Sequence, residues 1–449
     1  MQSFDVIVIG AGPGGYTAAA RAAQLGMRTA VVEKDRLGGM CMNWGCVPSR
    51  RLMEAGRLYR RIGQASAFGI DGIEASRLTF NWKKAVAEKD RLVRKLVADI
   101  GSLMEKHRVE VVAGEGRLVD PGSVRVGKET YAAGRTIIAT GSRPGRTAVA
   151  DLPRGIVAEI DEFYARKSIP ERIVLAGGGT IACELASLLR LIGRTVTIVS
   201  PDKELVPWLD GACRDFIAHK FRQSGVRVLA GSRISRVRNG IAHTGSERVR
   251  CDLIVNCSPR QAVLPPMDDV PLDLADGFIR TNDFMQTSVP SVYAIGDVAG
   301  GMSASLASAQ AICAVNHIAG LRDPIDMGRV PSTIYMDPEI SMVGATEETL
   351  QSRGVEYVKG EFPMSANSKA VVEASTEGFV KILADQRFGE LLGVHIVATR
   401  ASDLIAEAVM CMRTEGTLDD LTRVIHAHPT VSESFLEAGF QAMAKTMHV

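Results

Sequence analysis

The chain has 449 residues, more than one hydrophobic core accommodates, so we expect two to four domains. Apolar residues make up 46% and charged residues 23%, as in globular proteins, and a net charge of +2 provides no long-range field for attracting nucleic acid. Eight cysteines are too few for a disulfide scaffold, so a functional disulfide should be catalytic. Neither a signal peptide nor an apolar run of membrane-spanning length is visible, and we expect a cytoplasmic protein without membrane contact.

A glycine-rich turn follows the first predicted strand, DVIVIG. Gly10, Gly12 and Gly15 form a G-x-G-x-x-G pattern that passes into a helix, and Glu33 ends the next strand, TAVVEK. In this context Gly10 permits a tight turn, Gly12 lets a pyrophosphate approach the backbone, and Gly15 lets the helix pack closely. The helix N-terminus favours the phosphate charge, and Glu33 can accept a ribose hydroxyl. The pattern indicates an adenine-dinucleotide site rather than a tight turn alone.

Two cysteines follow in the segment RLGGMCMNWGCVPSR. A helix that begins near Gly39 would place Cys41 and Cys46 within about one and a half turns of each other, so they can form a disulfide. A helix N-terminus lowers a thiol pKa, and one cysteine can then persist as a thiolate that exchanges with a substrate dithiol or disulfide. The other interpretations are two buried core cysteines or half of a metal site, although no second Cys/His cluster in the sequence completes such a site.

Further along the chain, residues 80–107 have helical apolar spacing and residues 135–141 are typical of a short buried strand. A second strand–turn–helix unit begins near residue 172 and carries the pattern Gly177-x-Gly179-x-x-Ala182. Two such units predict two nucleotide-binding domains of one architecture. After about residue 330, alternating strands are followed by helices, which indicates a separate α+β domain.

A histidine and a glutamate stand near the C-terminus. His428 precedes a proline, and Glu433 follows five residues later, a spacing that lets the carboxylate turn back onto the imidazole and orient it. An imidazole held in this way can take a proton from a substrate thiol and stabilise the attacking thiolate. We interpret the neighbouring His426 as a structural residue.

These motifs resemble those of a known family. The stretch GGMCMNWGCVPSR resembles the active-site segment of the flavoprotein disulfide reductases, or class I pyridine nucleotide-disulfide oxidoreductases, and HPTVSE is similar to their HPTxSE motif. The likeness extends over the whole chain. Within the family, HAHPT, MSANSKA, GFVKILAD and GVHIVA favour the dihydrolipoamide dehydrogenase branch.

The resemblance implies that FAD and NAD, with NADP as the alternative, are the cofactors and that the chain forms a homodimer. It implies that Cys41 exchanges with substrate and that Cys46 lies against the flavin as the charge-transfer thiolate. It also implies that His428 and Glu433 reach the cysteine pair of the opposite subunit. The residues expected to hold FAD are Gly10, Gly12, Gly15, Glu33, Ala139, Thr140, Gly141, Gly296 and Asp297, and those expected at the second nucleotide are Gly177, Gly179, Ala182 and Ser200.

The sequence departs from the family pattern at three places. Ser200 stands where NAD-type relatives carry an acid for the ribose diol, and no arginine follows it in PDKELVPW to hold a 2′-phosphate. The later loop, usually GRxPN, is SPRQA at 258–262. Arg50 replaces a lysine that in relatives pairs with the glutamate matching Glu184. We expect either a permanently ionised, bidentate pair that alters the flavin or a simple conservative exchange.

The predicted fold is therefore α/β, with two Rossmann-like dinucleotide-binding domains and a C-terminal α+β dimerisation domain. The predicted limits are 1–147 with 272–328 for FAD, 148–271 for NAD(P) and 329–449 for the interface. The expected function is oxidation of dihydrolipoamide, or of dihydrolipoyl groups on a carrier protein, with NAD as acceptor and without a metal. The alternatives are an NADP-dependent reductase of another low-molecular-weight disulfide and a flavin electron-transfer or regulatory subunit with a degenerate nucleotide site.

Overall fold

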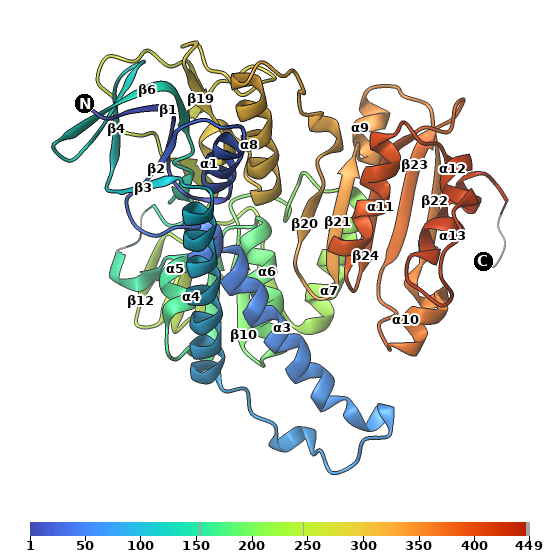
Figure 1. The fold of residues 1–449 in the computed structure, drawn as a ribbon. Coiled ribbons are helices and arrows are strands. Elements are labelled where there is room, and N and C mark those ends of the chain that lie inside the picture. The colour runs from blue at the N-terminus through green and yellow to red at the C-terminus, as the bar shows by residue number, and fades with distance from the viewer. Residues whose placement is uncertain (151, 153, 246, 446–449) are drawn as a thin grey trace.

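Three units, each centred on a sheet, make up the molecule (Figure 1). The computed structural model describes all residues except 151, 153, 246 and 446–449. Two units carry a glycine turn after a strand, one in a mixed sheet whose inner strands are parallel and the other in a parallel sheet. The third carries an antiparallel sheet with helices. The predicted fold class is confirmed, whereas the exact domain limits stay predictions.

The first sheet has the order β3-β2-β1-β6-β5-β4, and β19 pairs with β6. Its strands are β1 (Ser3–Ile9), β2 (Thr29–Glu33), β3 (Glu110–Ala113), β4 (Gly116–Asp120), β5 (Ser123–Val126), β6 (Glu129–Ile138) and β19 (Val292–Ala294). The inner strands β1 and β2 are buried almost without alternation, as is typical of a parallel sheet covered on both faces. The strand expected at 135–141 is the end of β6.

Helices α1 (Pro13–Gln24) and α8 (Ala304–Ile318) pack side by side in this unit. Ala18, Ala19 and Ala22 of α1 are completely buried, because small side chains let the helix approach its neighbours closely. The helix expected at 80–107 is confirmed as α4 (Trp82–Lys106), which packs along α3 (Cys46–Gly63). The short helix α2 (Gly39–Asn43) precedes α3.

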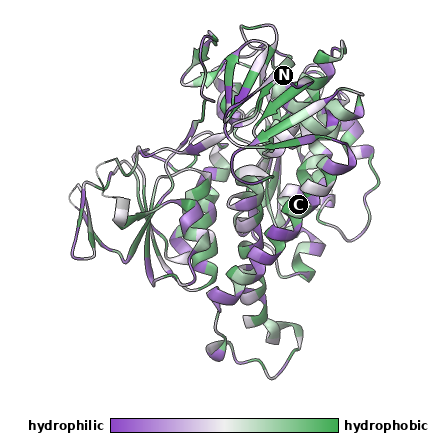
Figure 2. Cartoon of the chain, turned by 60° about the vertical axis from the view of Figure 1, so that its left-hand side comes forward, coloured by the Kyte–Doolittle hydropathy of each residue, from purple (hydrophilic) through white to green (hydrophobic). Residues whose placement is uncertain are grey.

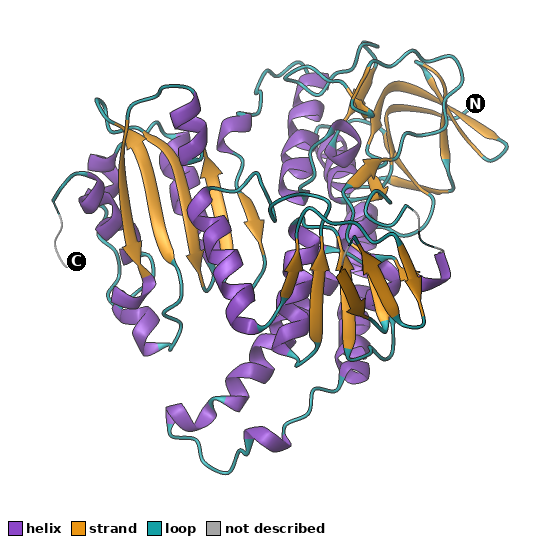
Figure 3. Ribbon diagram, turned by 180° about the vertical axis from the view of Figure 1, so that it is seen from behind, coloured by secondary structure: helices purple, strands orange, loops and turns teal. Residues whose placement is uncertain are grey.

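The second sheet is parallel, in the order β11-β10-β9-β15-β8, and is seen from behind in Figure 3. Its strands are β8 (Val157–Ala158), β9 (Arg172–Ala176), β10 (Thr195–Val199), β11 (Arg227–Leu229) and β15 (Leu253–Asn256), and its helices are α5 (Ile160–Ala165), α6 (Thr180–Leu191) and α7 (Gly211–Ser224). A small three-stranded sheet adjoins it and consists of β12 (Arg236–Arg238), β13 (Ile241–Thr244) and β14 (Glu247–Arg250). Two further pairs of strands are β7 (Ser142–Pro144) with β16 (Arg260–Ala262) and β17 (Leu274–Ala275) with β18 (Phe278–Ile279).

The third sheet is antiparallel, in the order β20-β21-β24-β23-β22. Its strands are β20 (Ser332–Ile334), β21 (Glu339–Gly344), β22 (Tyr357–Pro363), β23 (Phe379–Asp385) and β24 (Leu391–Ala398), and its helices are α9 (Glu347–Ser352), α10 (Ser368–Val372), α11 (Ala401–Arg413), α12 (Leu418–Arg423) and α13 (Glu433–Ala442). Its own apolar core includes Ile396 and Phe435. Figure 2 shows hydrophobic residues concentrated along the strands of the sheets. Within the described ranges, no helix has the length and apolar character needed to cross a membrane.

A buried ionic network joins the second unit to the third. Lys381 of β23 bonds both carboxylate oxygens of Asp210, at 2.9 and 3.0 Å, and Glu347 at 2.5 Å. Asp210 also caps α7 through the amide of Ala212. Burial opposes its ionisation, yet buried His395, the Glu347 amide and Lys381 hold the pKa of Asp210 below its ordinary value. A depressed carboxyl pKa stabilises the fold above the pKa of the unfolded chain, and this stability is lost as pH falls through the folded pKa.

We predict that Lys381→Met destabilises the protein by about 3–5 kcal/mol at neutral pH, because it leaves Asp210 charged and buried without its main partner. Lys359→Met is the matched control, since Lys359 contacts the same Glu347 but is half exposed and should contribute about 1 kcal/mol or less. Urea and thermal unfolding midpoints measure both effects. The difference in unfolding midpoint between the two variants should become smaller as pH falls below the pKa of Asp210. Equal midpoints at neutral pH would contradict the prediction.

Candidate active site

The first glycine turn leaves no space for side chains at two of its three glycines. Gly10 has φ +102°, and a Cβ there would lie 2.3 Å from the carbonyl oxygen of Ala139. A Cβ on Gly15 would lie 1.8 Å from the carbonyl oxygen of Gly10. Gly12, in contrast, has nothing within 4 Å and faces the cavity. Steric closure at two positions and open space at the third are what a pyrophosphate at the N-terminus of α1 requires.

One cavity of about 2110 Å³ brings together the two glycine turns and the cysteine pair. Its volume is about twice the upper end of ordinary ligand pockets, so two dinucleotides have room in it. The predicted residues that line it are Gly10, Gly12, Glu33, Ala139, Thr140, Gly141, Gly296, Asp297, Cys41, Cys46, Arg50, Glu184, Gly177 and Gly179. Gly15 and Ala182 lie behind the turns instead, where they allow close packing, and Ser200 is also outside the lining.

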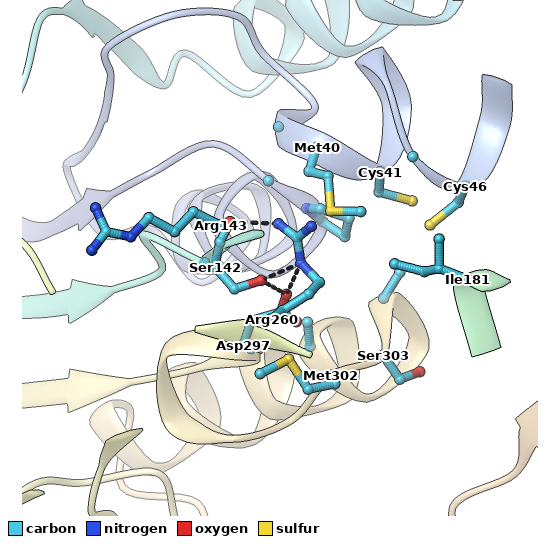
Figure 4. A pocket seen from close by; sticks show the side chains of 18 of the residues that line it. Met40, Cys41, Cys46, Ser142, Arg143, Ile181, Arg260, Asp297, Met302 and Ser303 are labelled. Carbon is cyan, nitrogen blue, oxygen red and sulfur yellow. Dashed lines mark hydrogen bonds and ion pairs between the residues drawn. The ribbon is translucent and has the colours of Figure 1, made fainter. Parts of the chain in front are cut away.

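The residues around the first turn fit FAD. Glu33 accepts the amide of Ala11 at 2.8 Å, which fixes its carboxylate at the end of β2, where a ribose hydroxyl would arrive. Asp297 also lines the cavity and accepts a hydrogen bond from the hydroxyl of Ser142 (Figure 4). Burial raises the pKa of Asp297, opposed by Ser142 and by Arg260. Two hydrogen-bonded acidic side chains in the same cavity as the open glycine turn suit a polyhydroxylated ligand with a pyrophosphate.

Arg260 is a cavity residue that the sequence analysis did not single out. Its Nε donates to the Ser142 hydroxyl at 2.7 Å, and another guanidinium nitrogen donates to the Ser142 carbonyl at 2.6 Å (Figure 4). It also lies 3.9 Å from Asp297. The 258–262 loop begins beside the second glycine turn, where Gly177 lies against Ser258, and through Arg260 it also contacts the first site. The pairing of β16 with β7 places Arg260 beside Ser142, and no local sequence pattern predicts this pairing.

The cysteine pair spans a break between two helices rather than lying on one helix that begins near Gly39. Helix α2 ends at Asn43, Gly45 has the non-helical angles φ −115° and ψ −104°, and Cys46 is the first residue of α3. Gly45 lies against Met40, where a Cβ would come within 2.9 Å. The break places Cys46, and not Cys41, at the N-terminus of an 18-residue helix, where the helix dipole favours a thiolate.

The two thiols are unlike each other electrostatically. Both are free and partly buried. A hydrogen bond from Cys41 lowers the pKa of Cys46, and Arg50 lowers it further, against the effect of burial. The same hydrogen bond, together with burial, raises the pKa of Cys41. Of the two thiols, Cys46 therefore loses its proton more readily, and Cys41 is the donor of the hydrogen bond between them.

Arg50 forms the expected ion pair with Glu184 at 2.7 Å. The guanidinium also donates to the Ser49 hydroxyl at 2.8 Å and lies 3.6 Å above the ring of Tyr335. Glu184 in turn accepts the amide of Tyr335 at 2.9 Å. The pair uses one guanidinium nitrogen, so it is not the bidentate contact that was predicted, and cation–π stacking on Tyr335 takes up the other face. Sequence spacing did not reveal Tyr335, which lies just after β20 in the third unit.

The second turn repeats the geometry of the first. Gly177 has φ +130°, and a Cβ there would lie 2.3 Å from the carbonyl oxygen of Cys257, whereas Gly179 has nothing within 4 Å. Ala182 is completely buried in α6, which explains how alanine serves in the third place. Ser200 is also completely buried, and its hydroxyl accepts the amide of Asp202 at 3.1 Å. Its side chain is therefore not directed into the cavity.

His428 and Glu433 form the predicted pair on the third unit. Nδ1 of His428 lies 2.7 Å from Glu433, whose second oxygen accepts the amide of Thr430 at 2.8 Å. Burial opposes ionisation of Glu433, but these hydrogen bonds hold its pKa below the ordinary value. The His428 side chain is 74% exposed and lies outside the cavity of its own chain. His426 is buried against Glu407 at 2.7 Å, in keeping with a structural role.

Among the described residues, no group of three or more His, Cys, Asp or Glu side chains is arranged to hold a metal ion. The reactive groups are the two thiols and the histidine–carboxylate pair, and the two glycine turns are suited to binding dinucleotides. Fold and site together define a flavoprotein oxidoreductase that acts on sulfur groups.

Comparison with known proteins agrees with this class. The sequence pattern of the pyridine nucleotide-disulphide oxidoreductases matches residues 4–311, and that of their dimerisation domain matches residues 330–439. The chain belongs to this family. It is 34% identical to a dihydrolipoyl dehydrogenase of Bacillus subtilis over 99% of both chains. The predicted cofactors, FAD and a pyridine nucleotide, are those of the dihydrolipoyl dehydrogenase family.

Two solved structures share the fold. LpdA from Mycobacterium tuberculosis superposes with a TM-score of 0.89 at 23% identity, covering 98% of this chain and 99% of that one. The HOCl-induced flavoprotein disulfide reductase RclA from Escherichia coli gives a TM-score of 0.84 at 23% identity, covering 98% and 99%. The resemblance inferred from the cysteine and histidine motifs is thus confirmed, and the third unit is the dimerisation domain.

We predict that Gly12→Ala yields a folded protein that retains little FAD. The backbone of Gly12 (φ −69°, ψ −175°) accepts alanine, and no protein atom lies near the new Cβ, so only a bound pyrophosphate would meet it. Gly179→Ala is the matched control at the second turn and should keep FAD but bind pyridine nucleotide weakly. The flavin-to-protein absorbance ratio after gel filtration measures retention. A normal ratio for Gly12→Ala would refute the assigned site.

We predict that Arg50→Met raises the pKa of Cys46, because the variant removes a nearby cation and leaves Glu184 unpaired beside the thiolate. Arg50→Lys keeps the charge and should leave the titration close to that of the wild type. Site-resolved alkylation of Cys46 in the reduced protein, followed across pH by mass spectrometry, reports the thiolate fraction. Superimposable profiles for Arg50→Met and the wild type would show that Arg50 does not tune this thiol.

Proposed function

We propose that the protein oxidises dihydrolipoyl groups on a carrier protein and passes the electrons to NAD. The observation that carries this proposal is the His428–Glu433 pair, which is exposed on the dimerisation domain and lies outside the cavity containing its own cysteines. A base so placed serves a cysteine pair only across a dimer. Oxidation of a dithiol needs such a base, because each attacking thiol has to lose its proton.

The thiol chemistry follows from the asymmetry of the cysteines. A substrate thiol gives its proton to His428 of the partner subunit, and the resulting thiolate attacks the sulfur of Cys41 in the oxidised pair. The Cys41–Cys46 bond breaks, and Cys46 leaves as the stabilised thiolate. The second substrate thiol then attacks the substrate sulfur of the mixed disulfide, and its proton goes to Cys41 as that sulfur leaves. The substrate dithiol has lost two electrons and two protons, of which one proton is on Cys41 and the other on His428.

Bound FAD would supply the two-electron relay between the cysteine pair and the pyridine nucleotide. Gly10, Gly12 and Gly15 would hold its pyrophosphate, with Glu33 and Asp297 at its hydroxyl groups. Arg50 stays charged throughout and keeps the Cys46 thiolate next to a fixed cation. Glu433 fixes the orientation of His428 and stabilises the imidazolium that forms.

NAD as acceptor, a lipoyl carrier as partner and a cytoplasmic setting belong to the proposal. Reduction of another small disulfide with NADP is the competing activity. A flavin electron-transfer subunit with a degenerate nucleotide site is the non-enzymatic alternative. The second turn counts against the latter, because the close packing at Gly177 and the open face at Gly179 are both present. A decayed site would have no reason to retain them.

The test is NAD-dependent turnover of dihydrolipoamide by mixed dimers. We expect His428→Gln to lower kcat by about 10²–10⁴-fold, the usual contribution of a general base, while FAD content is unchanged. Cys41→Ser should be inactive. A dimer of one Cys41→Ser chain and one His428→Gln chain contains one complete site if sites are shared, and it should recover about half of the wild-type activity.

Two controls separate the outcomes. His426→Gln changes a neighbouring histidine that pairs with Glu407 and should keep kcat near normal in molecules that remain folded. A mixed dimer as inactive as its parents would contradict a shared site. Wild-type turnover with NADP and other disulfides, but not with dihydrolipoamide and NAD, would favour the reductase, and no turnover with any pair would favour the electron-transfer subunit.

A further inference from the structure

The place of the missing ribose acid is closed to solvent. Ser200 follows the last residue of β10 and is completely buried, and a Cβ on Gly178 would lie only 2.4 Å from its hydroxyl. That hydroxyl accepts the amide of Asp202 at 3.1 Å. Ser200 therefore supports the glycine turn from beneath and shapes the loop that follows, and its side chain does not reach a ligand in the cavity.

The next acid along the chain, Asp202, does line the cavity. It lies beyond the end of β10, on the edge of the parallel sheet where β9 also ends at the glycine turn. Its amide is held by Ser200, and its carbonyl accepts the amide of Gly231 at 2.8 Å. The backbone is thus fixed on both sides. The residue is exposed, and its carboxylate has no hydrogen-bond or ion-pair partner among the residues that the structure describes.

We propose that Asp202 takes the place of the missing acid, accepts the adenine-ribose hydroxyls of NAD, and disfavours the 2′-phosphate of NADP. In dinucleotide folds the ribose lies outside the carboxyl end of the strand that follows the glycine turn, and an acid there selects the diol. Ser200 fixes the loop so that the acid two residues later is presented at this edge. The inference rests on the proposed pyridine-nucleotide acceptor and names the residue that selects it.

One cation of the cavity bears on the same choice. Arg233, in the loop after β11, also lines the cavity, and a guanidinium nitrogen donates to the carbonyl of Thr147 at 2.7 Å. That bond holds the guanidinium against the protein backbone, whereas the Asp202 carboxylate is free to accept hydrogen bonds from a ligand. A 2′-phosphate would bring at least one further negative charge next to the Asp202 carboxylate, and the two negative charges would repel each other.

The test measures binding of ADP-ribose and of its 2′-phosphate to the oxidised, FAD-loaded protein by calorimetry. Neither ligand carries a nicotinamide, so no electron transfer complicates the result. In Asp202→Asn we expect the affinity for ADP-ribose to fall about tenfold to a hundredfold, the loss typical of hydrogen bonds to a charged group. Affinity for the 2′-phosphate should rise in the same variant, because the like charge is gone.

Glu204→Gln is the matched control. It removes one negative charge from the same loop, but Glu204 pairs with Arg214 at 3.2 Å and lies outside the cavity lining, so both affinities should stay at wild-type values. Unchanged ADP-ribose binding in Asp202→Asn, or a wild type that prefers the 2′-phosphate, would overturn the inference. If ADP-ribose binding depends on Asp202 but dihydrolipoamide and NAD give no turnover, the proposed function fails while the assignment of Asp202 stands.

Discussion

The ion pair between Arg50 and Glu184 lies where all three units of the molecule meet. Arg50 belongs to the helix that begins at Cys46, Glu184 to the helix that follows the second glycine turn, and Tyr335 to the dimerisation domain. Desolvating two charges is costly unless their remaining hydrogen-bonding groups are satisfied. Here Ser49 and the Tyr335 amide satisfy them. The orientation of the redox helix, and with it the place of Cys46, depends on this contact.

The same contact explains why two identical side chains have opposite roles. Cys46 lies at a helix N-terminus with Arg50 one turn further along, and both features favour its anion. Cys41 lies on the other side of the break at Gly45, and its hydrogen bond to Cys46 and burial raise its pKa although Arg50 lowers it. The difference in pKa between the two thiols is thus set by the fold, and the sulfur with the lower pKa is the better leaving group in thiol–disulfide exchange.

Sequence reasoning captured what depends on local geometry and failed where contacts are long-range. The glycine turns, the cysteine pair and the His428–Glu433 pair each fit within a short segment, and the turns and the His428–Glu433 contact have the geometry that the patterns predict. Arg260 and Tyr335 join the site through strand pairing and packing across distant segments, which no local pattern encodes. The break between α2 and α3 was missed for another reason. Gly45 was treated as one residue of a helix, although glycine is the residue most easily released from helical angles.

The buried Lys381–Asp210 contact joins the dimerisation sheet to the part of the cavity around the second glycine turn. Asp210 ends the loop that begins at Ser200, and that loop contributes Asp202 and Trp208 to the cavity wall. One end of the loop is therefore fixed by the glycine turn and the other by a lysine of the dimerisation sheet. Because the helix with Glu433 packs on the same sheet, the His428–Glu433 pair and this part of the cavity wall are both attached to the dimerisation sheet. A change in the dimerisation domain should then affect both the His428–Glu433 pair and the cavity wall at the second glycine turn. Three domains that behaved independently would not show this effect.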